Sequence, residues 1–416
     1  MELGFNPYAP CVMHIDINSC FATCEQQAYP NLRGKPLVIA AYTTPRGFVL
    51  SPSIEAKRVG IKMGMTVGEA RQIYPRVIVR DPDPALIRSV HIKFRNLLKS
   101  YSASVTPKSI DEVVIDFSGT TYMDRDFREV GREIKMKIKK EIGDWIWCNV
   151  GISTNRFLAK LAAGIHKPDG LDVITFLNLK EVYKTRTLID LPGINVNFEA
   201  RLNAYNIFTP LQFLAAPSIL LQYRVFKSIL GRQWYQRLRG WEVDNIDFAR
   251  KSYGQNYALG KQTADQKEIA KLLLRLVEKM GRRLRRANFQ AQGVSLGILY
   301  TDQTYWHKSQ RFSTNLMTTE ELYSKLLWLL KKQPIIKKIR NLSVSCFDLI
   351  SSSIQQLELF GGKEKKYKIQ EAVDSVNNKW GDFTLTSPSA MGMRNIILDR
   401  IAFGQSRELE EIYNYN

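Results

Sequence analysis

The N-terminal part of the chain alternates between short apolar runs and longer segments with a helical repeat. Residues 11–17 and 111–117 alternate as strands do, and residues 147–152 form a third predicted strand. Residues 127–142 and 155–164 carry apolar side chains at helical spacing. Strands and helices in this order predict a mixed sheet covered by helices.

Proline and glycine interrupt the segment between the first two predicted strands. This composition predicts a small, loop-rich subdomain over residues 31–80, inserted into the sheet domain. The residues that interrupt the pattern are Pro45, Gly47, Pro52, Gly60, Gly64 and Gly68.

The pattern changes at about residue 176. Residues 188–226 are predicted to be helical, with a turn at Leu191-Pro192-Gly193-Ile194. Such a turn resembles a helix-hairpin-helix, whose backbone amides face a DNA phosphate. Because Pro-Gly turns also join ordinary helices, both interpretations stay open at this point.

The C-terminal part begins with a linker, because residues 240–252 show little periodicity. Beyond it the predicted order is strand, helix, strand, strand, helix, strand, followed by a loosely attached tail. These elements are expected at residues 267–288 and 320–332 (helices), 294–300 and 305–312 (hairpin), 342–350 (last strand) and 366–379 (a tail helix).

Composition and charge narrow the possible partners. The 416 residues include 60 Lys and Arg against 40 Asp and Glu, which gives a net charge of +20 and a pI near 9.6. This excess favours nucleic acid over an anionic membrane, because no apolar run approaches the roughly 18–20 residues that span a bilayer. The first ten residues lack the pattern of a signal peptide, so we expect a cytoplasmic monomer with reduced, packed cysteines.

Two acidic runs suggest the chemistry. Asp16 lies at the end of the first predicted strand, and Asp111 and Glu112 lie at the start of the second, with few cations beside them in sequence. Clustered carboxylates without cations suit divalent metal ions, which prefer oxygen ligands and also hold phosphates. The alternative is that Asp111 and Glu112 begin a turn and that Asp16 is an isolated residue.

The chain resembles the Y-family DNA polymerases, the translesion group that includes bacterial DNA polymerase IV and the UmuC-type enzymes. The resemblance covers about residues 11–350 and rests on several motifs in the same order. They are HIDINSCFA at residues 14–22, LRGKPLV at 32–38, SIEAK at 53–57, SIDE at 109–112, and GIS at 151–153 followed by Lys160 and KPDG at 167–170.

The resemblance implies an α+β, multidomain fold shaped like a right hand. The palm is a mixed sheet with helices, the fingers are small, the thumb is helical, and a βαββαβ little finger binds DNA. The implied boundaries are 1–30 and 81–175 (palm), 31–80 (fingers), 176–240 (thumb), 241–252 (linker), 253–350 (little finger) and 351–416 (tail).

The resemblance also assigns the catalytic residues. Asp16, Asp111 and Glu112, with the backbone carbonyl of Ile17, would hold two Mg²⁺ ions. One ion would help the primer 3′-hydroxyl to attack the α-phosphorus, and the other would stabilise the departing pyrophosphate. Asp116, one strand repeat further on, is interpreted as structural.

The resemblance assigns four nucleotide-binding residues. Phe21 would be a steric gate under the sugar of the incoming nucleotide. The alternative is that Phe21 is only a buried phenylalanine at the start of a helix. Lys57 and Lys167 would contact the triphosphate, with a hydroxyl from Ser51 nearby. Many family members have Tyr and Arg where this chain has Ile54 and Lys57, so the triphosphate would be held differently.

A cationic helix is the strongest predicted DNA contact. Residues 271–286 carry seven cations and one acid around an apolar stripe, which predicts an amphipathic helix with a cationic outer face. An ordinary solvated face is the alternative. The DNA-binding residues implied together with the helix-hairpin-helix are Gly193, Arg282, Arg283, Arg285, Arg286, Lys308 and Arg311.

The tail contains a second recognisable peptide. Gln356, Leu357, Leu359 and Phe360 resemble the motif by which bacterial polymerases dock on the sliding clamp. The glutamine would bond at the rim of a pocket that the three apolar side chains fill. The alternative is a short amphipathic piece folded onto the body.

The predicted function is template-directed DNA synthesis past lesions, with primer-template DNA and dNTPs as substrates. The short fingers and the lack of a separate exonuclease-like acidic cluster predict low fidelity without proofreading. A catalytically inactive accessory that binds DNA and the clamp is the main alternative. A palm-fold nucleotide cyclase is another, but it would leave the basic domain and the tail peptide unexplained.

Overall fold

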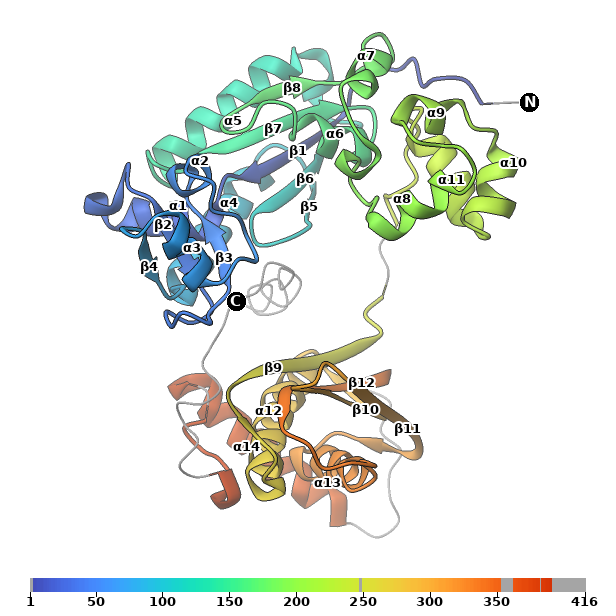
Figure 1. The fold of residues 1–416 in the computed structure, drawn as a ribbon. Helices are drawn as coiled ribbons and strands as arrows, with labels where there is room; N and C mark the ends of the chain where they lie inside the picture. The colour runs from blue at the N-terminus through green and yellow to red at the C-terminus, as the bar shows by residue number, and fades with distance from the viewer. Residues whose placement is uncertain (1–2, 247–248, 353–361, 382, 391–416) are drawn as a thin grey trace. The chain divides into compact units, whose positions relative to one another are not determined.

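The computed structural model describes residues 3–246, 249–352, 362–381 and 383–390 (Figure 1). These residues form two compact units, and the boundary between the units in the sequence lies between Ile246 and Asp247. Each unit has its own hydrophobic core and is described separately.

The first unit is built around a mixed five-stranded sheet. β1 (Val12–Ile17) lies at its centre and pairs antiparallel with β6 (Glu112–Asp116) and β7 (Cys148–Ser153). The edges are β5 (Ser104–Pro107) beside β6 and β8 (Leu171–Val173) beside β7. The three strands predicted from the sequence are confirmed, with ends shifted by about one residue.

The two faces of this sheet differ because side chains alternate along each strand. Met13, Ile15 and Ile17 point into an apolar core that also includes side chains from three helices. These helices are α1 (Cys20–Ala28), α4 (Pro84–Lys99) and α5 (Phe127–Glu141). The opposite face carries His14 and Asp16, so alternation puts the polar residues on one side.

Helix α6 (Arg156–Ala162) covers part of the polar face. Ala159 packs there against Val12 and Val114. The approach requires Gly151 on β7, because a Cβ at that position would lie only 2.0 Å from the Ala159 carbonyl oxygen. A glycine in the sheet therefore lets α6, which carries Lys160, lie against β7.

The segment 31–80 has more regular structure than its composition predicts. It forms a three-stranded sheet with two helices and its own small core, and loops such as residues 41–48 and 59–66 separate these elements. Gly60 and Gly64 have positive φ and lie in the turns between elements rather than interrupting them. The elements are β2 (Leu37–Ala40), β3 (Val49–Pro52), α2 (Ile54–Arg58), α3 (Val67–Ile73) and β4 (Ile78–Arg80).

The remainder of the first unit is helical, as predicted. A core of its own includes Phe213, Phe226 and Trp234. The elements are α7 (Leu179–Lys184), η3 (Leu188–Asp190), α8 (Val196–Asn203), α9 (Pro210–Ala215), α10 (Ser218–Leu220), the π-helical η4 (Leu221–Val225) and α11 (Ile229–Arg237).

The second unit has the predicted βαββαβ order. Its antiparallel sheet has the strand order β11-β10-β12-β9, and both helices contribute to one core against one face of it. The elements are β9 (Ser252–Thr263), α12 (Gln266–Arg286), β10 (Phe289–Tyr300), β11 (Tyr305–Leu316), α13 (Thr319–Leu330) and β12 (Ile339–Ser351).

The described part of the tail is integrated into the second unit, so the expectation of loose attachment is wrong. Helix α14 (Gly362–Trp380) is followed by a segment that ends in η5 (Pro388–Ala390). Arg275 on α12 donates hydrogen bonds to the Thr386 hydroxyl (2.9 Å) and to the Ala390 carbonyl (3.1 Å). Such contacts join residues more than 100 positions apart, which a local pattern does not reveal.

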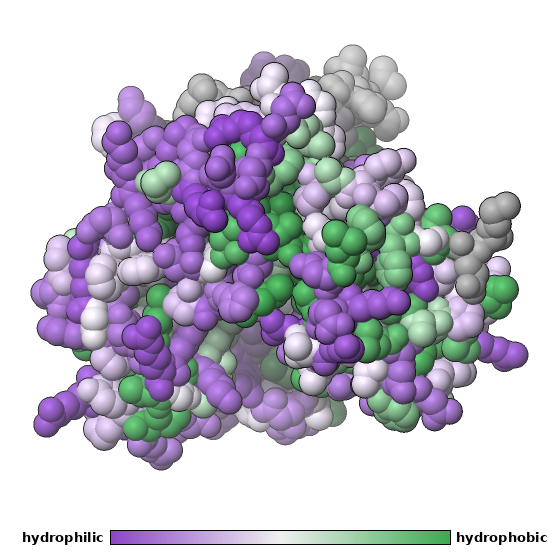
Figure 2. Space-filling view, turned by 90° about the horizontal axis from the view of Figure 1, so that it is seen from above, coloured by the Kyte–Doolittle hydropathy of each residue, from purple (hydrophilic) through white to green (hydrophobic). Residues whose placement is uncertain are grey.

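Among the described residues, no helix is both long enough and apolar enough to cross a membrane. On the face shown in Figure 2, hydrophobic side chains lie scattered between hydrophilic ones. All five cysteines are free thiols, and four of them are buried.

Candidate active site

The structure brings the three predicted carboxylates together. Asp16, at the end of β1, lies directly opposite Glu112, the first residue of β6. The Ile17 amide donates a hydrogen bond to the Asp111 carbonyl (2.9 Å), which aligns Asp111 with the same end of β1. The antiparallel pairing of β1 with β6 therefore brings together carboxylates that lie nearly a hundred residues apart in the sequence.

Two lysines pair with this acidic cluster, which corrects the expectation of few neighbouring cations. The Lys160 ammonium is 2.7 Å from a Glu112 carboxylate oxygen, and Lys167 forms an ion pair with Asp16. Both come from α6 and the turn after it, far from the acids in sequence. Their side chains are 43% and 47% exposed, so both ammonium groups are free to move into solvent.

The carboxylates have different proton affinities. Burial, helped by the charges of Asp16 and Glu112, raises the pKa of Asp111 to about 7, although a hydrogen bond from Ser109 opposes this shift. Burial also raises the pKa of Asp16 despite its ion pair with lysine. Burial acts against ionisation of Glu112 too, but the neighbouring His14 and lysines outweigh it and lower its pKa.

The donor set fits hard divalent cations only when the lysines move away. In the part of the chain that the structure describes, no group of three or more His, Cys, Asp or Glu side chains is arranged to hold a metal ion as it stands. The carboxylates nevertheless adjoin on the backbone, and they supply the oxygen ligands that Mg²⁺ prefers. A cation here would have to displace Lys160 and Lys167.

Two of the four predicted nucleotide-binding residues, Lys57 and Lys167, lie near the same site. Lys57 on α2 lies within electrostatic reach of it: partial burial and then the charge of Lys167 lower the pKa of Lys57, while Asp16 and Asp111 act in the opposite direction. Ser51 is buried on the adjacent β3. Phe21 is also buried, with 1% of its surface exposed, so its packing fits the structural interpretation as well as the steric gate.

The predicted turn at Leu191-Pro192-Gly193-Ile194 is present between η3 and α8, and its assignment to a helix-hairpin-helix stays a prediction. Gly193 has φ +95°, a conformation that L-residues rarely adopt, so the turn requires glycine. The Asn195 side chain caps α8, because its oxygen accepts hydrogen bonds from the backbone amides of Asn197 and Phe198. The turn therefore has a fixed geometry that can present its amides to an anion.

Comparison with protein families and curated proteins identifies this arrangement. The impB/mucB/samB family matches residues 15–164, and the C-terminal domain of the same family matches residues 250–359. Together these matches span more than half of the chain. The chain belongs to this family.

Curated relatives of this Y-family chain align over nearly its whole length. DNA polymerase IV of Pelotomaculum thermopropionicum is 29% identical over 399 residues, covering 94% of this chain and 97% of the relative. DNA polymerase IV 1 of Bacillus subtilis is 27% identical and covers 89% and 90%.

The fold of this family member also matches solved structures. A Y-family DNA polymerase chimera superposes with a TM-score of 0.71 at 24% identity, covering 82% of this chain and 99% of that one. The insertion ternary complex of Dbh DNA polymerase gives a TM-score of 0.57 at 23% identity, with the same coverage. The predicted α+β polymerase fold is confirmed.

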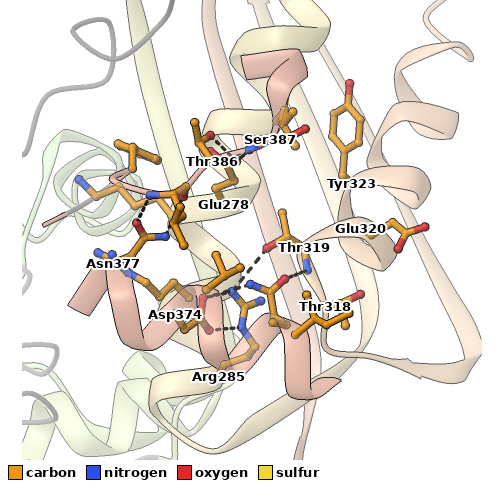
Figure 3. Close-up of a pocket in the computed structure, with 18 of the residues that line it drawn as sticks. Glu278, Arg285, Thr318, Thr319, Glu320, Tyr323, Asp374, Asn377, Thr386 and Ser387 are labelled. Atoms are coloured by element: carbon orange, nitrogen blue, oxygen red, sulfur yellow. Dashed lines mark hydrogen bonds and ion pairs between the residues drawn. The ribbon is translucent and has the colours of Figure 1, made fainter. Parts of the chain in front are cut away.

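The cationic helix of the second unit differs from its prediction. Arg285 is buried and pairs with Asp374 on α14 (2.5 Å) (Figure 3). Arg286 donates a hydrogen bond to the Asn378 side chain (2.6 Å). Arg283 donates to the Gly254 carbonyl (2.8 Å), while Arg282 lines a cavity of about 700 Å³ between α12, α13 and α14. The predicted open cationic face is thus largely occupied by the tail.

These contacts limit which residues of α12 can reach DNA. Arg285 is 8% exposed and is not available to a phosphate. Arg282, Arg283 and Arg286 are half-buried, and their DNA contacts stay predictions. The charge pattern of α12 does not reveal which arginines are buried. The helix packs both on the sheet and on the tail, and some of its arginines contact these two neighbours instead of solvent.

The sheet of the second unit offers a different surface. Lys308 lies opposite Leu296, on the side of the helices, whereas Arg311 lies opposite Gly293, on the other face. That other face carries small polar side chains: the Ser345 hydroxyl is 3.2 Å from the Ser295 hydroxyl. Along β10 and β12, glycines and serines alternate with buried apolar residues, and this alternation was the available signal in the sequence.

Sequence reasoning also missed a cationic cavity of about 390 Å³ in the helical part of the first unit. Arg201, Arg224 and Lys227 line it, and none of its lining residues is acidic. These three residues are spread over α8, η4 and the turn that follows η4, so no local run of charge marked them. The predicted clamp peptide, Gln356 to Phe360, lies outside the described residues.

Proposed function

We propose that the chain is a template-directed DNA polymerase that performs translesion synthesis by transferring nucleotides from dNTPs to a primer 3′-hydroxyl. The position of Asp16 opposite Glu112, with Asp111 beside them, carries this conclusion. Family membership and relatives named DNA polymerase IV support the same activity. The intact carboxylates do not favour an inactive accessory, because such a protein has no need for them.

Polymerases of this family use divalent metals, and the acidic cluster would hold two Mg²⁺ ions. Asp16, Asp111 and Glu112 are the proposed ligands, with the Ile17 carbonyl as a further donor. When bound, the ions supply Lewis acidity to the attacking hydroxyl and to the leaving pyrophosphate. β1 and β6 hold Asp16 and Glu112 on the sheet. Asp111 directly precedes β6, and its carbonyl accepts a hydrogen bond from the Ile17 amide.

The lysines would exchange one anionic partner for another. Lys167 balances Asp16 in this structure and would turn to the β- and γ-phosphates of a bound dNTP, joined by Lys57 and the Ser51 hydroxyl. Each lysine carries a point charge on a flexible stem, so its ammonium group can follow the phosphate through the reaction.

Primer-template DNA is the second substrate. The Gly193 turn would bind a backbone phosphate. Lys308 and Arg311 lie on opposite faces of the edge strand β11, and both would contact the duplex at that edge without reading its sequence. We further propose low fidelity without proofreading, a monomeric enzyme in the cytoplasm, and docking on the sliding clamp through Gln356, Leu357, Leu359 and Phe360.

Extension of a labelled primer tests the function directly. The full chain, Mg²⁺ and dNTPs should extend a primed template, first on an undamaged strand and then past an abasic site. A nucleotide cyclase would instead convert a single nucleoside triphosphate without DNA. Binding of the primed template without any extension would indicate the inactive accessory.

Replacement of Phe21 tests the steric gate. We expect Phe21→Ala to lower the preference for dNTPs over rNTPs by at least about tenfold, or about 1.4 kcal/mol, because the clash with a 2′-hydroxyl is removed. Since Phe21 is buried, truncation to Ala also costs about 3–5 kcal/mol of stability, so Phe21→Leu is the second variant. Single-turnover kinetics with each nucleotide give the ratio.

The control for that experiment is Phe117→Leu, because Phe117 is a fully buried member of the same core. It reproduces the loss of packing at a position without a predicted role at the sugar. If wild type, Phe21→Leu and Phe21→Ala prefer dNTPs over rNTPs to the same extent, Phe21 is not the steric gate.

Replacement of Lys160 tests the competition between lysine and metal. We expect Lys160→Met to tighten Mn²⁺ binding in the absence of nucleotide by roughly fivefold, about 1 kcal/mol, because the cation no longer displaces an ammonium group. Electron paramagnetic resonance of free Mn²⁺ measures the affinity. Lys140→Met, at an exposed position on α5, is the charge-matched control, and equal affinities in both variants would contradict the prediction.

A further inference from the structure

A cavity of about 240 Å³ adjoins the acidic cluster on the side of the helical segment. Asp16, Glu112 and the lysines of α6 and its turn form one wall, and Arg186 and Pro192 contribute to the other. No residue of the segment 31–80 lines it. Ser51 and Lys57 thus lie outside this cavity, and Lys167 is the one proposed triphosphate contact that borders it.

Three cations and three carboxylates line this cavity, but one of the cations, Arg186, has no ion-pair partner among the described residues. Lys160 and Lys167 pair with Glu112 and Asp16. The Asp190 carboxylate, although within electrostatic reach of Arg186, accepts hydrogen bonds from the amide (2.7 Å) and the hydroxyl (2.8 Å) of Thr187. Arg186 forms no ion pair with any described residue, and its buried Nε has no hydrogen-bond partner among them. A buried donor without an acceptor is unfavourable, so the site suits an added anion.

The position of the cavity identifies the anion. Pro192 belongs to the turn whose amides, next to Gly193 with its positive φ, are suited to a backbone phosphate. The opposite wall carries the carboxylates at which the primer 3′-hydroxyl would react. A strand that passes from this turn to those carboxylates places its last phosphodiester between them.

We propose that Arg186 binds the terminal phosphodiester of the primer strand and thereby positions the 3′-hydroxyl. This inference rests on the proposed polymerase function. A guanidinium group can bond both non-bridging oxygens of one phosphate, which fixes orientation as well as distance. Lys160 would add a second charge to the same phosphate once Glu112 has another partner.

A chemical double-mutant cycle tests the contact. Wild type and Arg186→Ala extend two primers, one natural and one whose terminal linkage is an uncharged methylphosphonate. We expect either change alone to lower kcat/KM by about tenfold, and both together to cause little further loss, because they remove the same interaction. The salt dependence of primer-template binding should also weaken by about one phosphate contact in Arg186→Ala.

Two further variants separate charge from geometry. Arg186→Lys keeps the charge without the fork and should retain an intermediate rate. Lys184→Ala removes an exposed cation two residues away, which pairs with Glu181 and does not line the cavity, and it should extend both primers like wild type. Circular dichroism melts establish that all variants are folded.

The other outcomes are also decisive. If the losses from Arg186→Ala and from the methylphosphonate multiply, Arg186 does not contact that phosphate. A raised KM for dNTP with an unchanged methylphosphonate effect would assign Arg186 to the triphosphate and overturn the inference. If wild type fails to extend the natural primer, the polymerase function itself fails, independently of Arg186.

Discussion

Conversion of Asp111 and Glu112 to Asn and Gln is expected to lower primer extension by about a thousandfold or more, equal to at least about 4 kcal/mol of transition-state stabilisation. The amides keep the shape of the side chains but remove two of the three charges that would hold the cations. Without those charges, neither the attacking hydroxyl nor the leaving pyrophosphate is stabilised. Single-turnover extension of a primed template measures the loss.

The electrostatics of the site predict that this loss is not caused by unfolding. The folded pKa of Asp111 is about 7, above its ordinary value of 3.8, so ionisation of this group destabilises the folded state as the pH rises from about 4 to 7. Asp111→Asn removes that cost. We therefore expect the single variant to melt no lower than wild type at pH 8, while it loses activity.

Asp116→Asn is the matched control. Asp116 lies on β6, the strand of Glu112, and forms an ion pair with Arg156 (3.3 Å). It lies opposite Val12, at the other end of β1 from Asp16. Extension within about twofold of wild type is expected for this variant. Near-normal extension by the Asp111→Asn, Glu112→Gln double variant would contradict the assignment of the catalytic carboxylates.

Much of the first unit was predictable because its signals are local. β1 and β6 alternate in sequence, and the short spacing within each motif places Asp16, Asp111 and Glu112 at strand ends. Their meeting in space depends on register, which no single segment contains. The resemblance to a known family supplied that information, and the observed pairing of Asp16 with Glu112 agrees with it.

Most of the missed features are contacts between distant segments. Lys160 reaches Glu112 across 48 positions, and Arg285 reaches Asp374 across 89. A count of charges along one helix treats every cation as solvent-facing, so it could not separate Arg285, which is buried, from residues that face solvent. Alternation along β10 and β12 would have located the polar sheet face. Successive side chains of a strand point to opposite faces, so the residues between the buried apolar ones must lie on the other face.

Loss of the Asp374 carboxylate is expected to be the most destabilising single change in the second unit. Asp374 accepts two hydrogen bonds from Arg285 (2.5 and 2.9 Å), whose side chain is 5% exposed. Asp374→Ala would leave a buried guanidinium without its counter-ion, at a cost of about 3–5 kcal/mol. Hydrogen exchange of peptides from α12 and α14 in the full chain measures the loss in protection.

Two comparison variants make the result specific. Glu364→Ala breaks an exposed ion pair with Lys368 on the same helix and should leave protection unchanged, because a solvated pair contributes little. Arg285→Met combined with Asp374→Leu replaces the pair by apolar side chains and should recover most of the protection, because no buried charge is left unpaired. If Asp374→Ala and Glu364→Ala behave alike, α14 does not anchor to α12 through this pair. The tail would then be an appendage, as the sequence first suggested, rather than a third element packed on the helices of the second unit.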